Sequence, residues 1–257
     1  MNWFENTLEQ IKKPSVPAFG GWCQIGHPAS AEIMARAGFS FVVLDCEHGE
    51  AEDTGIGDFC RAVRQFDCLP LVRVKENAVL PIRRALDLGA AGIIVPLVNS
   101  AEEAAKAVAA AKYPPEGIRG FAFHRGNNWG VDFAEYVKNA NAAIAVIVMV
   151  ESKEAVENID EILQTDGVDG IFIGPYDMSG SYGIIGQTDN PVIKEACSKV
   201  AAACKKYHKA AGAHIVTPNS KNVDSAVKQG VHLLALGMDT VFLANGAKQA
   251  LEMMQND

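Results

Sequence analysis

The chain has 257 residues, of which 49% are hydrophobic and 21% charged, and its formal net charge at pH 7 is −8. This composition is typical of a folded globular protein, and it excludes disorder, collagen and coiled coil as the main state. An acidic surface repels phosphate backbones and anionic lipids, so we expect no nucleic acid and no membrane among its partners. The length favours a single domain over residues 1–257, since α/β barrels often reach this size as one unit.

The cysteines and the N-terminus indicate a cytoplasmic protein. No C-x-x-C pair occurs among the cysteines, which occupy positions 23, 46, 60, 68, 197 and 204. In a chain of this size they are expected to be reduced thiols rather than disulfides or zinc ligands. The first thirteen residues include acidic side chains and no apolar core, which argues against a signal peptide. The apolar runs are also too short to span a bilayer.

Eight apolar segments alternate with segments of helical pattern. The apolar segments are typical of strands buried on both faces of a parallel sheet, and they cover residues 18–23, 41–45, 70–74, 92–96, 143–150, 170–174, 210–215 and 233–237. Helices are predicted over 30–37, 79–88, 100–111, 191–209, 220–229 and 240–253. The helix at 100 has a capping box of Ser100 and Glu103, and the helix at 191 has Asn190 as its cap and Pro191 in its first turn. Glycines at 38, 89, 167 and 230 precede four of the strands, as residues that end a helix in the left-handed conformation.

This alternation predicts a (β/α)8 TIM barrel. The alternative is an open, doubly wound sheet, but no G-x-G-x-x-G follows the first strand. Residues 113–142 do not fit the alternation, because they are too long for an ordinary loop between a helix and a strand. They contain a short predicted helix, DFAEYVKNA, together with Arg119, His124 and Arg125. This segment is either a subunit-packing loop or the wall of an anion site.

Polar side chains follow the C-terminal ends of the predicted strands, where barrel enzymes place their chemistry. Asp45 and His48 follow the second strand, Arg73 ends the third, Glu151 follows the fifth and Asp177 follows the sixth. Because these strand ends meet at one face of a barrel, the sequence predicts that a base, a cation and several acids converge there.

Each of these residues has a second interpretation. Glu151 and Asp177 could each cap a following helix, but together they could hold Mg²⁺ or a similar hard divalent ion. His48 beside Asp45 could be a general base or a surface histidine. Arg73 inside an apolar strand needs an anionic partner, which could be a structural aspartate or a substrate oxyanion.

Three further positions are candidates for contact with a ligand. Lys75 could form a Schiff base with a carbonyl substrate, although its polar neighbours favour a solvated loop. Gly174 would let a ligand approach the backbone, and the amides from Pro175 onward could hold a carboxylate, unless the segment is only a tight turn. His214, at the end of the seventh strand, either contacts the site or packs beside it.

Taken together, the motifs resemble those of the HpcH/HpaI family of class II (metal-dependent) pyruvate aldolases, such as 2,4-dihydroxyhept-2-ene-1,7-dioic acid aldolase. They cover nearly the whole chain in order: D-x-E-H, V-R-V, G-I-I-V-P, Y-P-P-x-G-x-R-G, a glutamate after the fifth strand and G-V-D-G-I-F-I-G-P-x-D-x-S. The resemblance implies a barrel of the phosphoenolpyruvate/pyruvate type. It also implies an aldehyde-lyase that forms or cleaves a 4-hydroxy-2-oxo acid, giving pyruvate and an aldehyde through an enolate at Mg²⁺, Mn²⁺ or Co²⁺.

The resemblance also assigns roles to the residues at the strand ends. Glu151 and Asp177 would bind the metal ion. Arg73 would contact the substrate and stabilise the enolate oxygen. His48, paired with Asp45, would manage the proton of the 4-hydroxyl group.

Other assignments concern substrate contacts and assembly. The pyruvate carboxylate would lie on the amides after Gly174, next to Pro175 and Trp22. The resemblance also implies a hexamer, in which Asp87 would reach the His–Asp pair of a neighbouring subunit. Many relatives have glutamine where this chain has Met149, and methionine cannot donate a hydrogen bond, so we expect different substrate contacts near the ion.

Three alternative functions remain open from the sequence. The same site could decarboxylate oxaloacetate, because loss of CO₂ gives the same enolate. A Schiff-base aldolase would use Lys75 instead of a metal ion. A non-catalytic barrel that binds 2-oxo acids is a third possibility, although the intact set of charged strand-end residues argues against it.

Overall fold

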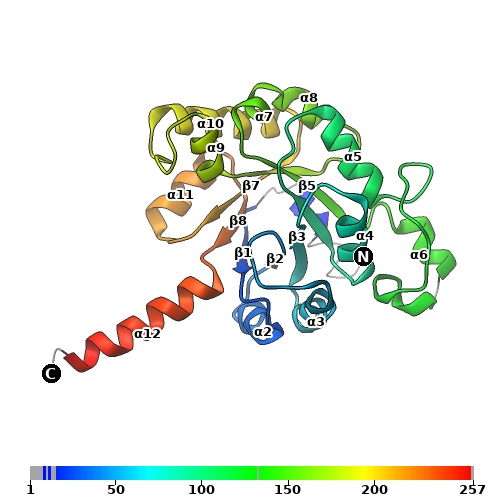
Figure 1. Cartoon of the computed structure of the whole chain (residues 1–257), viewed down its shortest axis with the longest axis horizontal. Helices are drawn as coiled ribbons and strands as arrows, with labels where there is room; N and C mark the ends of the chain where they lie inside the picture. Colours follow the sequence, from blue (N-terminus) through cyan, green and yellow to red (C-terminus); the bar gives the residue numbers. More distant parts are fainter. Residues whose placement is uncertain (1–7, 10, 13–15, 132, 256–257) are drawn as a thin grey trace.

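The strands of the computed structural model, which describes residues 8–9, 11–12, 16–131 and 133–255, form one closed parallel barrel in the order β1 to β8 (Figure 1). They are β1 (Ala18–Cys23), β2 (Phe41–Asp45), β3 (Leu69–Arg73), β4 (Gly92–Val95), β5 (Ala145–Val150), β6 (Gly170–Ile173), β7 (Ala210–Ile215) and β8 (Leu233–Leu236). The predicted (β/α)8 architecture is confirmed, and every predicted strand is present within two residues of its expected bounds.

The helices surround the barrel (Figure 1). They are α2 (Pro28–Arg36), α3 (Asp53–Val63), α4 (Val79–Asp87), α5 (Ala101–Ala111), the 3₁₀ helix η1 (Arg125–Gly130), α6 (Phe133–Asn139), α7 (Lys153–Glu157), α8 (Ile159–Gln164), α9 (Pro175–Ser181), α10 (Pro191–Lys206), α11 (Ser220–Lys228) and α12 (Asp239–Gln255). Ser100 and Asn190 are confirmed as caps, since Ser100 accepts from the Glu103 N–H and Asn190 accepts from the Val192 N–H. The predicted capping box is only half formed, because the Glu103 carboxylate accepts from the Asn99 N–H instead of the Ser100 N–H. The four glycines expected after helices have φ angles between +90° and +109°.

The core has two layers, because successive side chains of a strand point to opposite faces of the sheet. One layer fills the barrel and includes Phe41, Leu71, Ile147 and Phe172. The other lies between the strands and the helices. Most strand residues are therefore buried on either face, which explains the continuous apolar runs in the sequence.

Helix α3 is an element that the sequence analysis did not predict. Its buried side chains Ile56, Phe59, Cys60 and Val63 have the i, i+3, i+4, i+7 spacing of an amphipathic helix. Glycines at 55 and 57 lower the intrinsic helix propensity of the segment and mask this signal. Packing against the barrel stabilises the helix despite them.

Two segments stand apart from the regular barrel. Residues 113–142 contain η1 and α6, which confirms the short helix predicted in DFAEYVKNA, although its Asp132 lies outside the described residues. Helix α12 extends away from the barrel instead of packing along it (Figure 1). It exposes several large apolar side chains: Phe242, Leu243, Leu251, Met253 and Met254.

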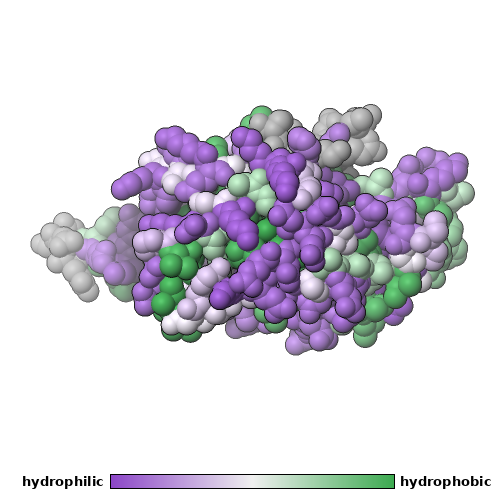
Figure 2. Space-filling model, turned by 90° about the horizontal axis from the view of Figure 1, so that it is seen from above, coloured by the Kyte–Doolittle hydropathy of each residue, from purple (hydrophilic) through white to green (hydrophobic). Residues whose placement is uncertain are grey.

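Figure 2 shows a face that is mostly hydrophilic, with hydrophobic side chains gathered in small separate groups. Within the described residues, no helix is long and apolar enough to cross a bilayer. The prediction that no signal peptide is present concerns the first thirteen residues, most of which lie outside the described residues.

Candidate active site

A cavity of about 320 Å³ opens at the C-terminal ends of the strands and contains five of the predicted site residues. We call it the rim cavity. It is lined by Trp22, Gln24, Arg73, Met149, Phe172, Ile173, Gly174, Pro175, Tyr176, Asp177, Thr188, His214, Val216 and Met238. Its position matches the end of a TIM barrel at which catalytic residues collect.

Asp45 is the buried anion that organises one side of this rim. Its Oδ1 accepts hydrogen bonds from Arg73 Nε at 2.9 Å and from the backbone N–H groups of Glu47 and His48 at 3.1 Å. Its Oδ2 accepts from Arg73 Nη2 at 2.5 Å and from Trp22 Nε1 at 3.2 Å. Burial opposes ionisation, but the hydrogen bonds and charge of Arg73 outweigh it and keep the pKa of Asp45 below its ordinary value. Asp45 is therefore a fixed negative charge.

Arg73 has structural anionic partners and still faces the cavity. The parallel register places it opposite Asp45 on the neighbouring strand. Its Nη1 lies 3.0 Å from Glu47 Oε2, and its guanidinium carbon is 5.0 Å from the centre of the Trp22 ring. A guanidinium held by two carboxylates and an aromatic face keeps one orientation. Arg73 thus presents a preorganised positive charge to the cavity.

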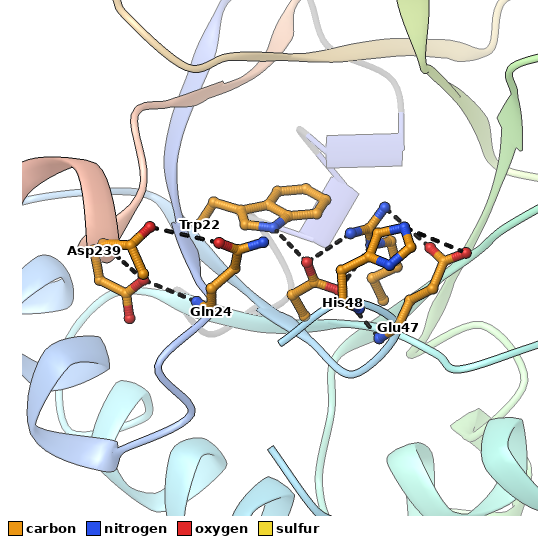
Figure 3. A network of polar contacts seen from close by, with 8 residues as sticks. Trp22, Gln24, Glu47, His48 and Asp239 are labelled. Carbon is orange, nitrogen blue, oxygen red and sulfur yellow. Dashed lines mark hydrogen bonds and ion pairs between the residues drawn. The ribbon is translucent and has the colours of Figure 1, made fainter. Parts of the chain in front are cut away.

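The position of His48 differs from the predicted side-chain pair with Asp45. Asp45 contacts the backbone N–H of His48 and not its imidazole. The carboxylate that approaches the imidazole belongs to Glu47, with Nε2 and Oε1 4.0 Å apart, and the His48 side chain is 63% exposed. In Figure 3, Gln24 and Trp22 lie between Asp239 on one side and the His48–Glu47 pair on the other. Tight hydrogen bonding of Asp45 to Arg73 and the backbone leaves the imidazole to a different carboxylate.

Glu151 is a second buried acid of the rim, and two further carboxylates, Glu47 and Asp177, act on it. Glu151 is 5% exposed, and its Oε1 accepts a hydrogen bond from the Leu97 N–H at 2.8 Å. Burial raises the pKa of Glu151, and the negative charges of Glu47 and Asp177 add to the effect. Burial likewise raises the pKa of Glu47, in spite of the nearby Arg73. Glu47 and Asp177 thus lie close enough to Glu151 to disfavour the ionisation of Glu151.

The capping interpretation of Glu151 and Asp177 does not hold. Ser152 caps α7 by accepting from the Ala155 N–H, and Gly174 occupies the N-cap position of α9. A Cβ atom at position 174 would lie 3.0 Å from Glu151 Oε2, so glycine is required for the backbone to pass this carboxylate.

The carboxylates fit a divalent cation. Among the described residues, no group of three or more His, Cys, Asp or Glu side chains is arranged as a ready metal site. Glu151 and Asp177 would therefore supply only part of a coordination sphere, which hard ions such as Mg²⁺ commonly complete with water and substrate oxygens. A bound cation would offset both the burial and the carboxylate repulsion that raise the pKa of Glu151.

His214 contacts the cavity, which answers a question that the sequence left open. Its ring is stacked on Trp22, with centres 4.8 Å apart. Its Nε2 lies 3.0 Å from the carbonyl oxygen of Gly237, which can only accept, so Nε2 carries the hydrogen. Burial lowers the pKa of His214 to about 4. The imidazole is therefore neutral near pH 7, and Nδ1 is an acceptor.

Two other predicted residues lie away from the rim cavity. Asp87, at the end of α4, pairs within the chain with the buried Arg119 at 2.7 Å and lies 3.3 Å from His124 Nε2. Lys75 is about half exposed and pairs with Glu52 at 3.3 Å. Neither belongs to the residues that line the cavity. The solvated position expected for Lys75 is confirmed, and it counts against a Schiff-base mechanism.

Glu47 and Asp239 are contributors that the sequence analysis did not single out. The signal for Glu47 was its place in the D-C-E-H run directly after β2. Asp239 starts α12 and accepts from the N–H groups of Gln24 at 2.9 Å and Ile25 at 3.1 Å. It thereby fixes the loop after β1, which carries one wall of the cavity.

The fold and site define a barrel enzyme whose polar groups gather at the C-terminal rim, and sequence comparison gives its family. Residues 19–246 match the family described as HpcH/HpaI aldolase/citrate lyase, and the chain belongs to this family. It is a carbon–carbon lyase of the pyruvate aldolase type.

Individual relatives agree with this assignment. The chain is 37% identical over 237 residues to a 5-keto-4-deoxy-D-glucarate aldolase of Klebsiella pneumoniae, which covers 92% of this chain and 91% of that protein. It is also 37% identical to a hydroxypyruvate/pyruvate aldolase of Roseobacter denitrificans, with 95% and 94% covered. A family member of known structure from Burkholderia cenocepacia superimposes with a TM-score of 0.92 at 29% identity, covering 98% and 99% of the two chains.

Proposed function

We propose that this aldolase forms and cleaves a 4-hydroxy-2-oxo acid with the residues of the rim cavity and with a divalent ion held by Glu151 and Asp177. The observation that supports this proposal is that the rim holds a fixed cation, Arg73, and a buried Glu151 whose ionisation is opposed by burial and by the nearby Glu47 and Asp177. Mg²⁺, Mn²⁺ and Co²⁺ all suit carboxylate and water ligands. A bound ion would supply Lewis-acid charge at the oxygen atoms of a 2-oxo acid.

Arg73 stabilises the charge that develops during cleavage. When the bond between C3 and C4 breaks, its electron pair moves toward the C2 carbonyl oxygen and gives the enolate of pyruvate. A guanidinium already oriented by Asp45 and Glu47 needs no reorganisation to stabilise this oxygen. Preorganised groups of this kind are typically worth about 3–4 kcal/mol of transition-state stabilisation.

His48 is the base that we assign to the 4-hydroxyl proton. Its imidazole is exposed at the rim, where a substrate hydroxyl can reach it, and Glu47 lies beside it to stabilise the protonated form. As the proton leaves, the C4 oxygen becomes the carbonyl oxygen of the aldehyde. The pyruvate carboxylate is assigned to the amides that follow Gly174 and Pro175, next to Trp22.

The same findings rank the alternative functions. Oxaloacetate decarboxylation would pass through the same enolate, but the curated relatives described above are named as aldolases. The names of these relatives also count against a non-catalytic barrel that binds 2-oxo acids, since all of them describe enzymes. We therefore retain the aldolase as the function.

We also propose a homo-oligomer, a hexamer as in the family resemblance, in the cytoplasm. The projecting α12 and the exposed apolar side chains of residues 113–142, which include Phe121, Phe123 and Trp129, support contacts between copies. In such an assembly Asp87 and its segment could approach a neighbouring site.

Exchange of the pyruvate methyl protons tests the enolate directly. After chelator treatment, we expect deuterium to enter the methyl group in D₂O only when Mg²⁺ or Mn²⁺ is added, as followed by NMR. The Lys75→Gln variant should exchange at the wild-type rate, because Lys75 pairs with Glu52 outside the cavity. Exchange without any ion, together with a borohydride-trapped adduct on Lys75, would overturn the proposal.

A further inference from the structure

His214 lines the rim cavity, but the proposed mechanism gives it no role. It lies on the inner face of the barrel, because the register sets it beside Ala235, a residue of the core inside the barrel. Gly212, two residues earlier on the same face of β7, leaves room for Phe172, whose ring would lie 2.7 Å from a Cβ atom at that position. The strand thus brings the imidazole to the wall of the cavity.

Two contacts fix the orientation of this imidazole. Its ring is stacked on Trp22, with an angle of 11° between the two planes, and Trp22 is itself held by a hydrogen bond to Asp45. Nε2 donates to the carbonyl oxygen of Gly237 at 3.0 Å. A neutral imidazole carries one hydrogen, and this bond places it on Nε2, so Nδ1 has a free lone pair. His214 is therefore a preorganised hydrogen-bond acceptor.

The Nδ1 atom of His214 is open to the cavity. Within the part of the chain that the structure describes, Nδ1 accepts no hydrogen bond, and it is not among the buried side-chain atoms that lack a partner. Because the residue lines the cavity, a ring nitrogen that is neither bonded nor sealed from solvent faces the interior of the cavity. A polar group of a ligand can therefore reach this atom.

The chemistry of Nδ1 selects a neutral hydrogen-bond donor. Its lone pair repels the carboxylate and carbonyl oxygens of a 2-oxo acid, which only accept. An ammonium group is disfavoured as well, because, in addition to burial, the charge of Arg73 lowers the pKa of His214 by more than the charge of Asp45 raises it. A hydroxyl group is neutral and can donate, so it is the group that fits this position.

The floor of the cavity makes such an acceptor necessary for a hydroxylated ligand. Three apolar residues of the core inside the barrel also line the cavity and are at most 4% exposed: Trp22, Met149 and Phe172. A hydroxyl group buried against such a floor costs free energy unless it forms a hydrogen bond. His214, stacked on Trp22, offers Nδ1 at the edge of this floor.

We propose that His214 is a specificity-determining residue, whose Nδ1 accepts a hydrogen bond from a substrate hydroxyl group other than the 4-hydroxyl assigned to His48. The substrate is therefore a hydroxylated one. This hydroxyl group belongs either to the 2-oxo acid, next to its carbonyl group, or to the aldehyde. The inference rests on the proposed aldolase function and identifies a further group of its substrate.

Pairs of substrates of equal size test the proposal and distinguish the two sources of the hydroxyl group. Hydroxypyruvate has a hydroxyl group where 2-oxobutanoate has a methyl group, and glycolaldehyde and propanal form the matching pair of aldehydes. Proton NMR follows carbon–carbon bond formation with Mg²⁺, using acetaldehyde with the first pair and pyruvate with the second. The quantity compared is the ratio of kcat/KM for the hydroxyl compound to kcat/KM for the methyl compound. Intrinsic reactivities cancel when this ratio is compared between the wild type and a variant.

Two variants separate hydrogen bonding from stacking. His214→Phe keeps a ring on Trp22 but has no acceptor, and it should lower the ratio of one pair by about tenfold or more. The pair affected identifies the source of the hydroxyl group. His214→Asn loses the ring but keeps an acceptor oxygen near the position of Nδ1, so it should retain more of the ratio than His214→Phe does. His232→Phe, which precedes β8 and lies outside the cavity lining, is the matched control and should keep both ratios.

Nitrogen NMR of the full-length chain labelled with ¹⁵N-histidine gives a readout that needs no turnover. The chain has six histidines, and the signal of His214 can be assigned with His214→Asn. With Mg²⁺ present, we expect hydroxypyruvate or glycolaldehyde to move the Nδ1 signal upfield, as hydrogen bonding to a bare ring nitrogen does, and the methyl compounds to leave it in place. If Nδ1 responds in this way while no carbon–carbon bond forms, the aldolase proposal fails and the hydroxyl contact stands.

Two results would overturn the inference. If His214→Phe keeps both wild-type ratios while His214→Asn changes them, the residue acts only through its stacking on Trp22. If the Nδ1 signal responds equally to the hydroxyl compounds and to their methyl counterparts, His214 does not recognise a hydroxyl group.

Discussion

The two sides of the rim carry similar carboxylates in opposite states. Asp45 is fully buried, yet donors surround it, and its pKa lies below the ordinary value. Glu151 is almost as buried, but burial and the nearby carboxylates outweigh the hydrogen bond from the Leu97 N–H, and the pKa of Glu151 is raised. The difference teaches that burial alone does not set the role of an acid. The compensated acid fixes the structure of the site, and the uncompensated acid is suited to bind a cation.

The largest effect is expected from Asp45→Asn, which removes the compensated charge. The variant leaves Arg73 buried with only Glu47 as an anionic neighbour, and breaking a buried pair typically costs about 3–5 kcal/mol. Urea unfolding should show this loss at pH 7. Asp160→Asn, which disrupts the exposed pair with Lys206, should leave the unfolding curve almost unchanged. If the wild type and Asp45→Asn give the same urea unfolding curve, Asp45 does not organise this side of the rim.

At the second buried acid of the rim, Glu151→Gln should spare stability and strongly reduce activity. The amide oxygen can still accept from the Leu97 N–H, and loss of a disfavoured buried charge does not weaken the fold. Metal-dependent cleavage should fall by a factor of about 10²–10³, as for removal of a preorganised charge-stabilising group. Coupled pyruvate assays and Mn²⁺ binding by electron paramagnetic resonance measure the two effects. Glu154→Gln, on the exposed side of α7, is the control.

The outcome of this pair of variants decides the comparison. If Glu151→Gln binds Mn²⁺ and turns over as the wild type does, the uncompensated side is not the cation site. If Glu151→Gln loses as much unfolding free energy as Asp45→Asn does, the two carboxylates have the same structural role, and the contrast between them is wrong.

A smaller, pH-dependent effect is expected at His214. Its pKa is lowered to about 4, so between pH 6.5 and 4 the unfolded chain binds a proton that the folded chain does not. Stability from this group is therefore complete above pH 6.5 and decreases as the pH falls, by about 2 kcal/mol between pH 7 and 5. His214→Phe keeps a ring on Trp22 and should lose this part of the pH dependence. The unfolding free energy of both proteins can be measured with urea at pH 7 and at pH 5. An equal decrease for the wild type and for His214→Phe would contradict this prediction.

Much of the fold could be predicted because the barrel depends on local patterns. Continuous apolar runs mark strands buried on both faces, and glycine marks the helix ends at Gly38 and Gly89, where φ is positive. Helix α3 was missed because Gly55 and Gly57 weaken its propensity, and only packing on the barrel compensates for them. The candidate site residues were predicted from the rule that chemistry follows the strand ends, and five of them line the rim cavity: Trp22, Arg73, Gly174, Pro175 and Asp177.

The sequence by itself determined the barrel, the family and the set of charged residues at its rim, because these follow from periodicity, motifs and strand order. Only the tertiary structure decided which charges meet. It paired Asp45 with Arg73 and not with the imidazole of His48, since parallel register sets the first pair side by side. It also brought Arg125 to Arg61 and Arg64, across a distance in sequence that no local pattern spans. Pairing of charges depends on geometry in three dimensions, and so do pKa shifts and cavities.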